Sequence, residues 1–225
     1  MKRRIVLIGL LALALLPLAC SNNPPQINNI RWQVVLFRNR LLGDTYQRLS
    51  VFLLANDKDG EKDLESMYVI NDNDELFWSL PSEKWEKATI HGATWIGSNG
   101  LSMPDGRNLP AGMYRVLLED QSGQTVETQF YVKKDNVETG NARFPSVSVK
   151  NDRIVVEGDF TDPEVWIYDA NDAFVDRQPL PQKYADISSI RTKFKQLADG
   201  FTYYVYAKKN GVYYGVMTGP YYYSP

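Results

Sequence analysis

The sequence predicts an all-β protein built as two tandem β-sandwiches. Three observations predict this fold class. Apolar residues alternate with polar residues along most of the chain, which is the period of a strand with one buried face. Turn-forming Asn, Asp and Gly residues recur between the alternating segments. No long segment has the helical period that a crossover between parallel strands would need.

The N-terminal segment has the parts of an export signal. Three basic residues occupy positions 2–4, and an almost purely apolar run of fourteen residues follows at positions 5–18. This run is shorter than the roughly 20 residues that a helix needs to span a hydrocarbon core. We therefore expect residues 1–19 to be a cleaved signal peptide rather than a transmembrane helix.

The end of this segment resembles the lipobox of bacterial lipoproteins. Residues 15–20 read Leu-Leu-Pro-Leu-Ala-Cys, with a small residue directly before Cys20, although Pro17 and Leu18 depart from the commonest pattern. The resemblance implies that the Cys20 thiol takes a diacylglyceryl group and that acyl chains such as palmitate anchor the folded part outside the cytoplasm. Ser21 stands where an aspartate would signal inner-membrane retention, which favours the outer membrane.

Composition limits the partners of the mature chain. Cys20 is the only cysteine, so no disulfide framework is expected. Removing residues 1–19 takes away three basic residues, which leaves 22 basic against 27 acidic residues and a formal charge of about −5. A mildly acidic protein has no electrostatic basis for binding nucleic acid.

The mature chain divides at two polar segments. Residues 20–27 are Pro-rich and cannot bury apolar surface, so we expect a short tether. Residues 135–143 are polar and lack alternation, so we place a linker there. The predicted β-sandwich domains are therefore residues 28–134 and residues 144–225.

Within these domains the strands follow from alternation and the turns between them. The clearest alternating sets are Ile30, Trp32, Val34 and Leu36, then Tyr114, Val116 and Leu118, then Val126, Thr128, Phe130 and Val132. Residues 82–87 look briefly helical, with Ser82 as a possible N-cap. Residues 188–196 are ambiguous, and we interpret them as a strand because Ile190, Thr192 and Phe194 alternate with basic residues.

A faint internal repeat supports two similar domains. Residues 68–77 and residues 166–175 each read as a strand, an Asn/Asp turn and a second strand. The segment Leu109–Val116, followed by Asp120 and Gly123, resembles a late hairpin of bacterial immunoglobulin-like and fibronectin III-like domains. That resemblance implies a sandwich scaffold but no particular activity, because such scaffolds host many functions.

The chain is poorly supplied with catalytic groups. His91 is the only histidine, no cysteine remains after lipidation, and no G-x-S-x-G motif is present. We therefore predict a non-enzymatic protein without a catalytic residue or cofactor, and interpret His91 as a loop or strand-edge residue. A hydrolase using two carboxylates stays as a weaker alternative, because their separation is a tertiary property.

The acidic segment Asn56–Glu65 resembles a calcium loop only in part. With Gly60 at position 6 of an EF-hand, Asp57 and Asp59 fall at ligand positions, but Ala55 and Ser66 stand at positions 1 and 12. The other acidic segments are ordinary turn sequences. We therefore favour solvated turns and predict no metal site.

Tyrosines concentrate near the C-terminus, where eight of the fourteen lie between positions 203 and 223. A type I′ turn at Asn210–Gly211 would pair Tyr206 with Gly215 and Tyr204 with Met217. One face of this hairpin would suit the core. The other would be an exposed patch of Tyr204, Tyr206, Lys208, Tyr213 and Met217.

Such a patch predicts a binding surface, since tyrosine is rigid, partly apolar and ends in a hydroxyl. Two other interpretations are that strands simply favour tyrosine and that the other domain covers this face. The leading hypothesis is a membrane-anchored envelope lipoprotein that serves adhesion, assembly or scaffolding through a protein partner. The alternative is a carbohydrate-binding module with Tyr204, Tyr206 and Tyr213 as a stacking platform.

Overall fold

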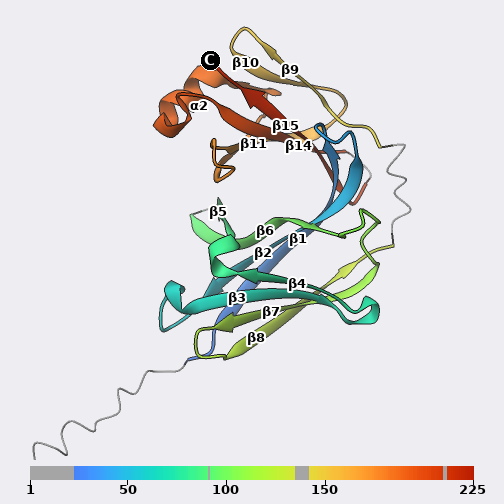
Figure 1. Ribbon diagram of the computed structural model, residues 1–225, viewed down its shortest axis with the longest axis vertical. Helices are drawn as coiled ribbons and strands as arrows, with labels where there is room; N and C mark the ends of the chain where they lie inside the picture. Colours follow the sequence, from blue (N-terminus) through green and yellow to red (C-terminus); the bar gives the residue numbers. More distant parts are fainter. Residues whose placement is uncertain (1–22, 91, 135–141, 210–211) are drawn as a thin grey trace, which may run out of the picture.

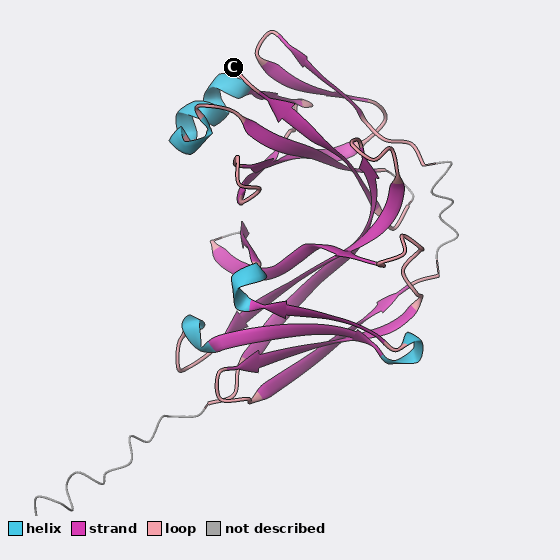
Figure 2. Cartoon of the chain, in the orientation of Figure 1, coloured by secondary structure: helices cyan, strands magenta, loops and turns pink. Residues whose placement is uncertain are grey.

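The protein was analysed as a computed structural model, which describes residues 23–90, 92–134, 142–209 and 212–225. The predicted signal peptide, Cys20, His91 and the turn Asn210–Gly211 lie outside the described residues. The described chain forms three β-sheets, and its helical segments are short pieces at the ends of strands (Figure 2). The prediction of an all-β fold is confirmed.

The first half of the chain contributes eight strands and three short 3-10 helices. Their bounds are β1 Gln26–Asn39, β2 Thr45–Asn56, η1 Glu61–Asp63, β3 Leu64–Asn71, η2 Asp72–Asp74, β4 Leu76–Pro81, η3 Ser82–Lys84, β5 Glu86–Ile90, β6 Ala93–Ser102, β7 Gly112–Asp120 and β8 Thr125–Val132. The helical prediction at residues 82–87 holds for η3 alone, and Ser82 does not cap it, since the N-cap is Pro81. Strand β1 also includes Gln26 and Ile27, which the sequence placed in the tether.

The second half contributes seven strands and one described α-helix. Their bounds are β9 Ser146–Lys150, β10 Arg153–Glu157, β11 Thr161–Tyr168, β12 Phe174–Pro179, β13 Tyr184–Asp186, α2 Ile187–Lys193, η5 Lys195–Leu197, β14 Phe201–Lys208 and β15 Gly215–Tyr223. The strand predicted at residues 188–196 is wrong, because the segment is helical. Ile187 and Ile190 are the buried residues of α2, and their spacing of three places both on one helical face.

One large sheet runs through both halves. Its strand order is β12-β11-β14-β15-β1-β2-β6-β5. Strand β1 pairs antiparallel with β2 and also parallel with β15, from Val35 opposite Gly215 to Asn39 opposite Gly219. The two ends of the described chain therefore meet at the middle of this sheet, which is strongly bent so that its edges at β5 and β12 face each other (Figure 1).

Two smaller sheets cover the convex side of the bent sheet (Figure 1). The four-stranded sheet β4-β3-β7-β8 packs on the β1, β2 and β6 end, and the three-stranded sheet β13-β10-β9 packs with α2 on the β11 and β14 end. Each interface is a separate hydrophobic core. The first includes Leu53, Met67 and Leu118, and the second includes Ile154 and Ile167, all completely buried.

The turn interpretation of the internal repeat is confirmed. The Asn71 Oδ1 accepts hydrogen bonds from the backbone N–H of Asn73 and Asp74 between β3 and β4. The Asp169 Oδ1 likewise accepts from Asn171 and Ala173 between β11 and β12. Both segments are strand, turn and strand, because the Asx side chain satisfies backbone donors that would otherwise lack partners.

Candidate functional site

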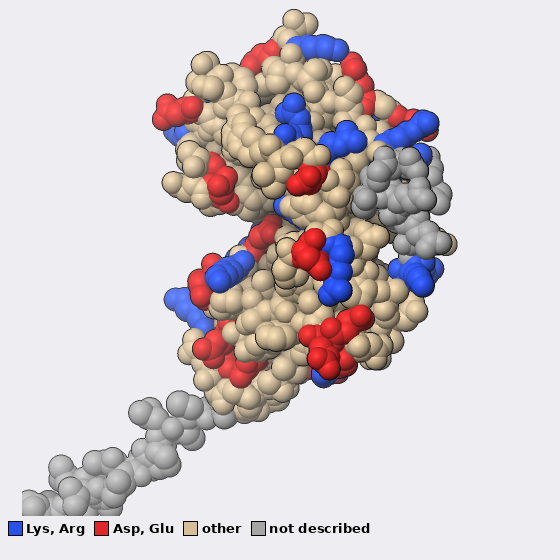
Figure 3. Space-filling view, turned by 45° about the vertical axis from the view of Figure 1, so that its right-hand side comes forward, with Lys and Arg blue, Asp and Glu red and all other residues tan. Residues whose placement is uncertain are grey.

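The concave side of the bent sheet carries the candidate site. Two adjoining pockets of about 500 Å³ and about 400 Å³ lie along it and share Trp166 and Asn99 in their walls. We call these two pockets together the concave groove. A hollow between the two halves is visible from the side, with charged side chains of both signs beside it (Figure 3).

Strand alternation explains why this groove is aromatic. On β2, Leu49, Val51 and Leu53 point into the convex core, so their neighbours point to the concave side. The same alternation on β11 and β14 turns aromatic side chains to the groove. Aromatic residues of β1, β2, β11 and β14 come together on this side: Phe37, Tyr46, Trp166, Tyr168, Tyr204 and Tyr206.

The larger pocket is lined in part by a stacked pair of rings. Trp166 and Tyr206 lie 5.7 Å apart between ring centroids at an interplanar angle of 22°. The Tyr206 hydroxyl donates a hydrogen bond of 2.7 Å to the Gln33 Oε1, which connects β14 to β1. Burial raises the pKa of the Tyr206 phenol, so this hydroxyl stays protonated as the donor at neutral pH.

Two glycines of β15 make room for the tyrosines of β14. A Cβ atom at Gly215 would collide with the ring of Tyr206, and one at Gly219 would lie too close to the ring of Tyr204. Both rings therefore lie flat against the sheet, where a larger residue on β15 would displace them. This pairing of aromatic residues with glycines fixes the shape of the groove wall.

Charged side chains in the larger pocket are held by defined partners. The Trp166 Nε1 donates to the Glu164 Oε2 at 3.0 Å, and the Arg177 Nε lies 3.4 Å from the same oxygen. The Arg31 guanidinium lies 4.7 Å from the ring centre of Trp95. The groove therefore offers both carboxylate and guanidinium groups beside flat aromatic surfaces.

The smaller pocket has an aromatic floor and a polar wall. The Arg48 guanidinium lies 3.5 Å from the ring centre of Phe37 and donates to the Tyr46 hydroxyl. Asn99 donates from its side-chain amide to Glu86 and accepts from the Ser50 hydroxyl. Each of these polar groups has a partner within the chain, which orients it toward the pocket in one arrangement.

The rim of the smaller pocket is apolar and exposed. Leu41 and Tyr222 line this pocket, yet their exposed fractions are 66% and 64%. Leu42, beside Leu41 in the β1–β2 turn, is exposed to 69%. Isolated exposed apolar residues are common, but here Leu41 and Tyr222 are grouped at the mouth of an aromatic pocket.

The predicted exposed tyrosine face is not exposed as a whole. Tyr206 and Met217 are each only 4% exposed, because they pack against Val35, Phe37 and Trp166 in the bend of the sheet. The prediction of exposure is wrong for these two residues, which are covered by Val35 and Phe37 from the first half of the chain and by Trp166 from the second.

The other predicted residues have different positions. Tyr204 is half-buried in the groove wall, and Lys208 is exposed at its edge, with its Nζ 3.7 Å from the Asp162 Oδ2. Tyr213 lies away from the groove in the β14–β15 connection, where its exposed ring is 4.2 Å from the Lys133 Nζ. Of the five residues, the structure brings Tyr204, Tyr206, Lys208 and Met217 together and leaves Tyr213 apart.

The predicted hairpin register is also wrong by two residues. Strand β14 ends at Lys208 and β15 begins at Gly215, and Tyr206 pairs with Met217 instead of Gly215. A shift of two residues keeps every side chain on its own face. The assignment of Val205 and Ala207 to the core face and Tyr204 to the other therefore holds.

Sequence reasoning missed the groove residues that lie far from the tyrosine hairpin. Arg31, Arg48, Asn99 and Trp166 come from strands β1, β2, β6 and β11, and no motif in the sequence connects them. In the sequence, the only indication of these residues was that polar or aromatic side chains occupy the strand face opposite the apolar core face. That signal does not say which faces meet.

Two further features bear on chemistry. Glu86 and Glu164 lie in the groove on strands from different halves. Outside the groove, Asp57, Asp59 and Asp63 form the group in the described residues whose ligand atoms lie within 4.8 Å of one another and could hold a metal ion.

None of the helices in the described part is both long and apolar enough to cross a membrane.

Comparison with known proteins gives only distant structural similarity. No family model matches the chain, and no curated protein is detectably similar in sequence. Among solved structures, the chain is similar to dimeric latent PorU from Porphyromonas gingivalis, with 15% identity, a TM-score of 0.34, and coverage of 90% of this chain and 21% of that chain. It is also similar to Tp47, the 47-kilodalton lipoprotein of Treponema pallidum, with 11% identity, a TM-score of 0.31, and coverage of 90% and 51%.

The chain thus spans about a fifth of PorU and about half of Tp47. Both similar proteins are bacterial.

Proposed function

We propose that this protein is a lipid-anchored envelope protein that binds a protein partner in the concave groove. Cys20 would carry the lipid, and the folded part would lie outside the cytoplasm, close to the membrane. The groove is built from both halves of the chain, so a ligand there would contact the two halves at once.

The exposed apolar rim is the observation that carries this proposal. Leu41 and Tyr222 would lose most of their exposed surface under a partner that enters the smaller pocket. Burying a side chain of this size is worth about 1.5–3 kcal/mol. Aliphatic Leu41 suits an apolar protein side chain better than a sugar, which favours a protein partner over a glycan.

The scaffold would be immunoglobulin-like or fibronectin III-like. In support, Tyr114 at the start of β7 donates its hydroxyl to the Pro110 carbonyl oxygen at 2.8 Å. A tyrosine that bonds the backbone a few residues upstream is a recurrent feature of immunoglobulin-like sandwiches. Asp120 and Gly123 then form the β7–β8 turn, as the sequence resemblance implies.

Site-specific photo-crosslinking in the native envelope tests this function. A photo-reactive phenylalanine analogue replaces Tyr222 in the full-length lipoprotein, and the matched control replaces Tyr131, an exposed tyrosine of β8 away from the groove. We expect a discrete crosslinked protein from position 222 and none from position 131. No crosslink at position 222, or equal crosslinks at both positions, would contradict the proposal.

Affinity measurements with the captured partner would then locate the contact. The double variant Leu41→Ser and Tyr222→Ala should bind at least tenfold more weakly, because tenfold equals about 1.4 kcal/mol. The matched control is Phe77→Ser on β4, which removes an apolar side chain of similar exposure outside the groove. It should bind like the unaltered protein.

Carbohydrate binding is the second candidate, favoured by the flat Trp166–Tyr206 pair beside the polar side chains of Gln33 and Glu164. Glycan-array binding that is lost in the variant Trp166→Ala but kept in Tyr213→Ala would support it. Release of sugar products from a bound glycan, abolished by Glu164→Gln, would instead assign hydrolysis to the groove carboxylates.

A further inference from the structure

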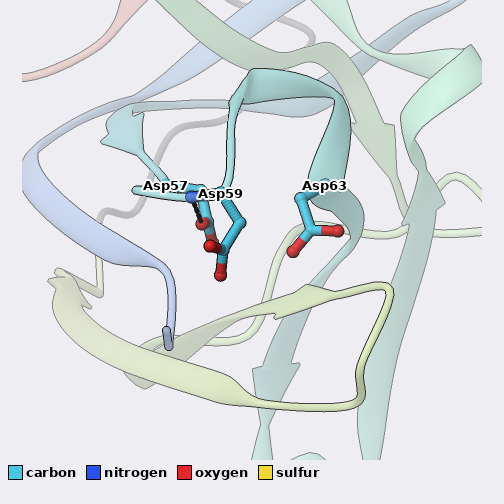
Figure 4. A group of neighbouring side chains, drawn as sticks. All are labelled: Asp57, Asp59 and Asp63. Carbon is cyan, nitrogen blue, oxygen red and sulfur yellow. Dashed lines mark hydrogen bonds between the residues drawn. The ribbon is translucent and has the colours of Figure 1, made fainter. Parts of the chain in front are cut away.

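Three carboxylates gather where the loop after β2 meets η1 (Figure 4). Asp57, Asp59 and Asp63 each offer an oxygen, and these oxygens lie within 4.8 Å of one another. Like charges at this separation repel strongly unless a cation or protons intervene.

A fourth carboxylate adjoins this group from strand β7. Asp120 is completely buried and pairs with Leu64, the residue after Asp63, while the Gln121 N–H donates to the Asp63 carbonyl oxygen at 2.8 Å. Residues opposite each other in an antiparallel pair project to the same face. Asp120 therefore projects to the same face as Leu64, and the backbone bond from Gln121 holds its strand against Asp63.

Two carboxylate oxygens of this part of the chain lack a hydrogen-bond donor among the described residues. The Asp57 Oδ2 and the Asp120 Oδ2 are both buried atoms without a hydrogen-bond partner in the described structure. A buried carboxylate oxygen without a partner is costly, and native proteins satisfy such oxygens with donors or cations. The unsatisfied oxygens of Asp57 and Asp120 therefore point to a missing positive ligand.

Turn formation explains only half of this arrangement. The Asp57 Oδ1 accepts from the Asp59 N–H at 2.7 Å, and the Asp120 Oδ1 accepts from the backbone of Ser122 and Gln124. These bonds use one oxygen of each carboxylate. The second oxygens have no role in the turns, so their burial needs another cause.

We propose that Asp57, Asp59 and Asp63, supported by the buried Asp120, form a calcium site. Calcium takes six to eight oxygen ligands in flexible geometry, which a set of carboxylates completed by water can supply. Magnesium demands a near-ideal octahedron and gives up water reluctantly, so it should bind more weakly. The proposal departs from the EF-hand comparison, because Asp63 would fall at position 9 of that spacing but Asp120 comes from strand β7, outside it.

The proposed calcium site lies next to the first described residue of the chain. The Asn23 N–H, at the first described residue, donates to the Asp59 Oδ2 at 2.8 Å. A calcium ion held by Asp59 would therefore also fix the backbone at Asn23. Calcium would also tie the loop after β2 to the β7–β8 turn, which come from different sheets.

Calorimetric titration of the full-length lipoprotein in detergent, stripped with EDTA and desalted, tests the site with calcium chloride and magnesium chloride as probes. Extracellular calcium modules bind with dissociation constants of about 10⁻⁴–10⁻³ M, and we expect this range. At 10 mM calcium the melting temperature should then rise by about 3–10 °C.

The variant Asp57→Asn gives the sharpest result, because an amide keeps the oxygen that accepts from Asp59 but removes the charge. It should bind calcium at least tenfold more weakly and should melt no lower than the unaltered protein in calcium-free buffer, since repulsion is relieved. Asp199→Asn, an exposed acid of the second half, is the matched control and should leave calcium binding unchanged.

Three outcomes would overturn the proposal. The first is no calcium heat and no thermal shift at 10 mM. The second is equal calcium affinity in Asp57→Asn and Asp63→Asn compared with the unaltered protein. The third is an equal loss in Asp199→Asn. If Asp57→Asn fails to fold, Asp63→Asn decides by the same tenfold criterion.

Discussion

The two sides of the bent sheet differ in what their side chains do. On the convex side, Leu53 and Ile167 are completely buried under the smaller sheets and belong to two cores of mostly aliphatic residues. On the concave side, Trp166 and Tyr206 pack against each other beside charged groups and an open groove. The same strands supply both sides, because neighbouring residues point in opposite directions.

This difference bears on stability and on the recognition that we propose for the groove. The convex side buries apolar surface against other sheets, which is the main favourable contribution to folding. The concave side is shaped by bonds between individual side chains, such as that from Tyr206 to Gln33. Substitutions on the convex side should therefore act on unfolding, and substitutions on the concave side on the shape of the groove.

The largest effect is expected on the convex side. Leu53→Ala removes a completely buried side chain from the first core and leaves a cavity. We expect a loss of about 2–5 kcal/mol in the free energy of unfolding, measured by urea denaturation. A loss below about 1 kcal/mol would mean that this core does not hold the sheets together.

A glycine on the concave side should have the next largest effect. Gly215→Ala places a methyl group against the ring of Tyr206, so the ring must move. Overpacking of this kind costs about 1–3 kcal/mol, and ligand binding in the groove should weaken as well. Gly100→Ala is the control for stability alone, because the nearest atom to its Cβ would be the Ser98 Oγ at 3.7 Å, while Gly100 itself lines the smaller pocket.

Alkaline pH should weaken the fold through its buried tyrosines. Burial raises the pKa of Tyr203 to about 12, above the value of 10 for an exposed phenol, and raises that of Tyr206 as well. The unfolded chain then loses protons first, so stability is full below pH 10 and falls as the pH rises toward 12. The loss is about 1.4 kcal/mol per pH unit for each such tyrosine.

Tyrosinate absorbance and circular dichroism, followed together, check this expectation. Tyr203→Phe should flatten the fall in stability above pH 10, because one of the titrating groups is gone. Ionisation of all tyrosines near pH 10 without unfolding would show that these phenols are accessible to water.

The smallest effect is expected from Tyr206→Phe, which keeps the ring but removes the donor to Gln33. A hydrogen bond of this kind contributes about 0.5–1.5 kcal/mol, measured by the same urea denaturation. Groove binding should change more than stability, since Gln33 loses the bond that orients it. Tyr213→Phe, in the exposed connection, should change neither quantity.

The groove could be predicted only in part. Alternation assigned Tyr204, Tyr206 and Met217 to one face correctly, and a register error of two residues did no harm to that assignment. The helix α2 was missed because Ile190, Thr192 and Phe194 alternate as in a strand, while the buried pair Ile187 and Ile190 follows the helical spacing. A short segment satisfies both periods, and the sequence alone does not choose between them.

By itself, the sequence determined that the chain is all-β, where the Asx turns fall, and which face of each strand suits a core, because these depend on neighbouring residues. Only the tertiary structure decided that β1 pairs with β15 across the whole chain and bends one sheet around a groove. Strand pairing uses backbone groups that every residue carries, so no side-chain pattern identifies the partner strand. For that reason Tyr206, Gln33 and Trp166 became neighbours only in the folded molecule.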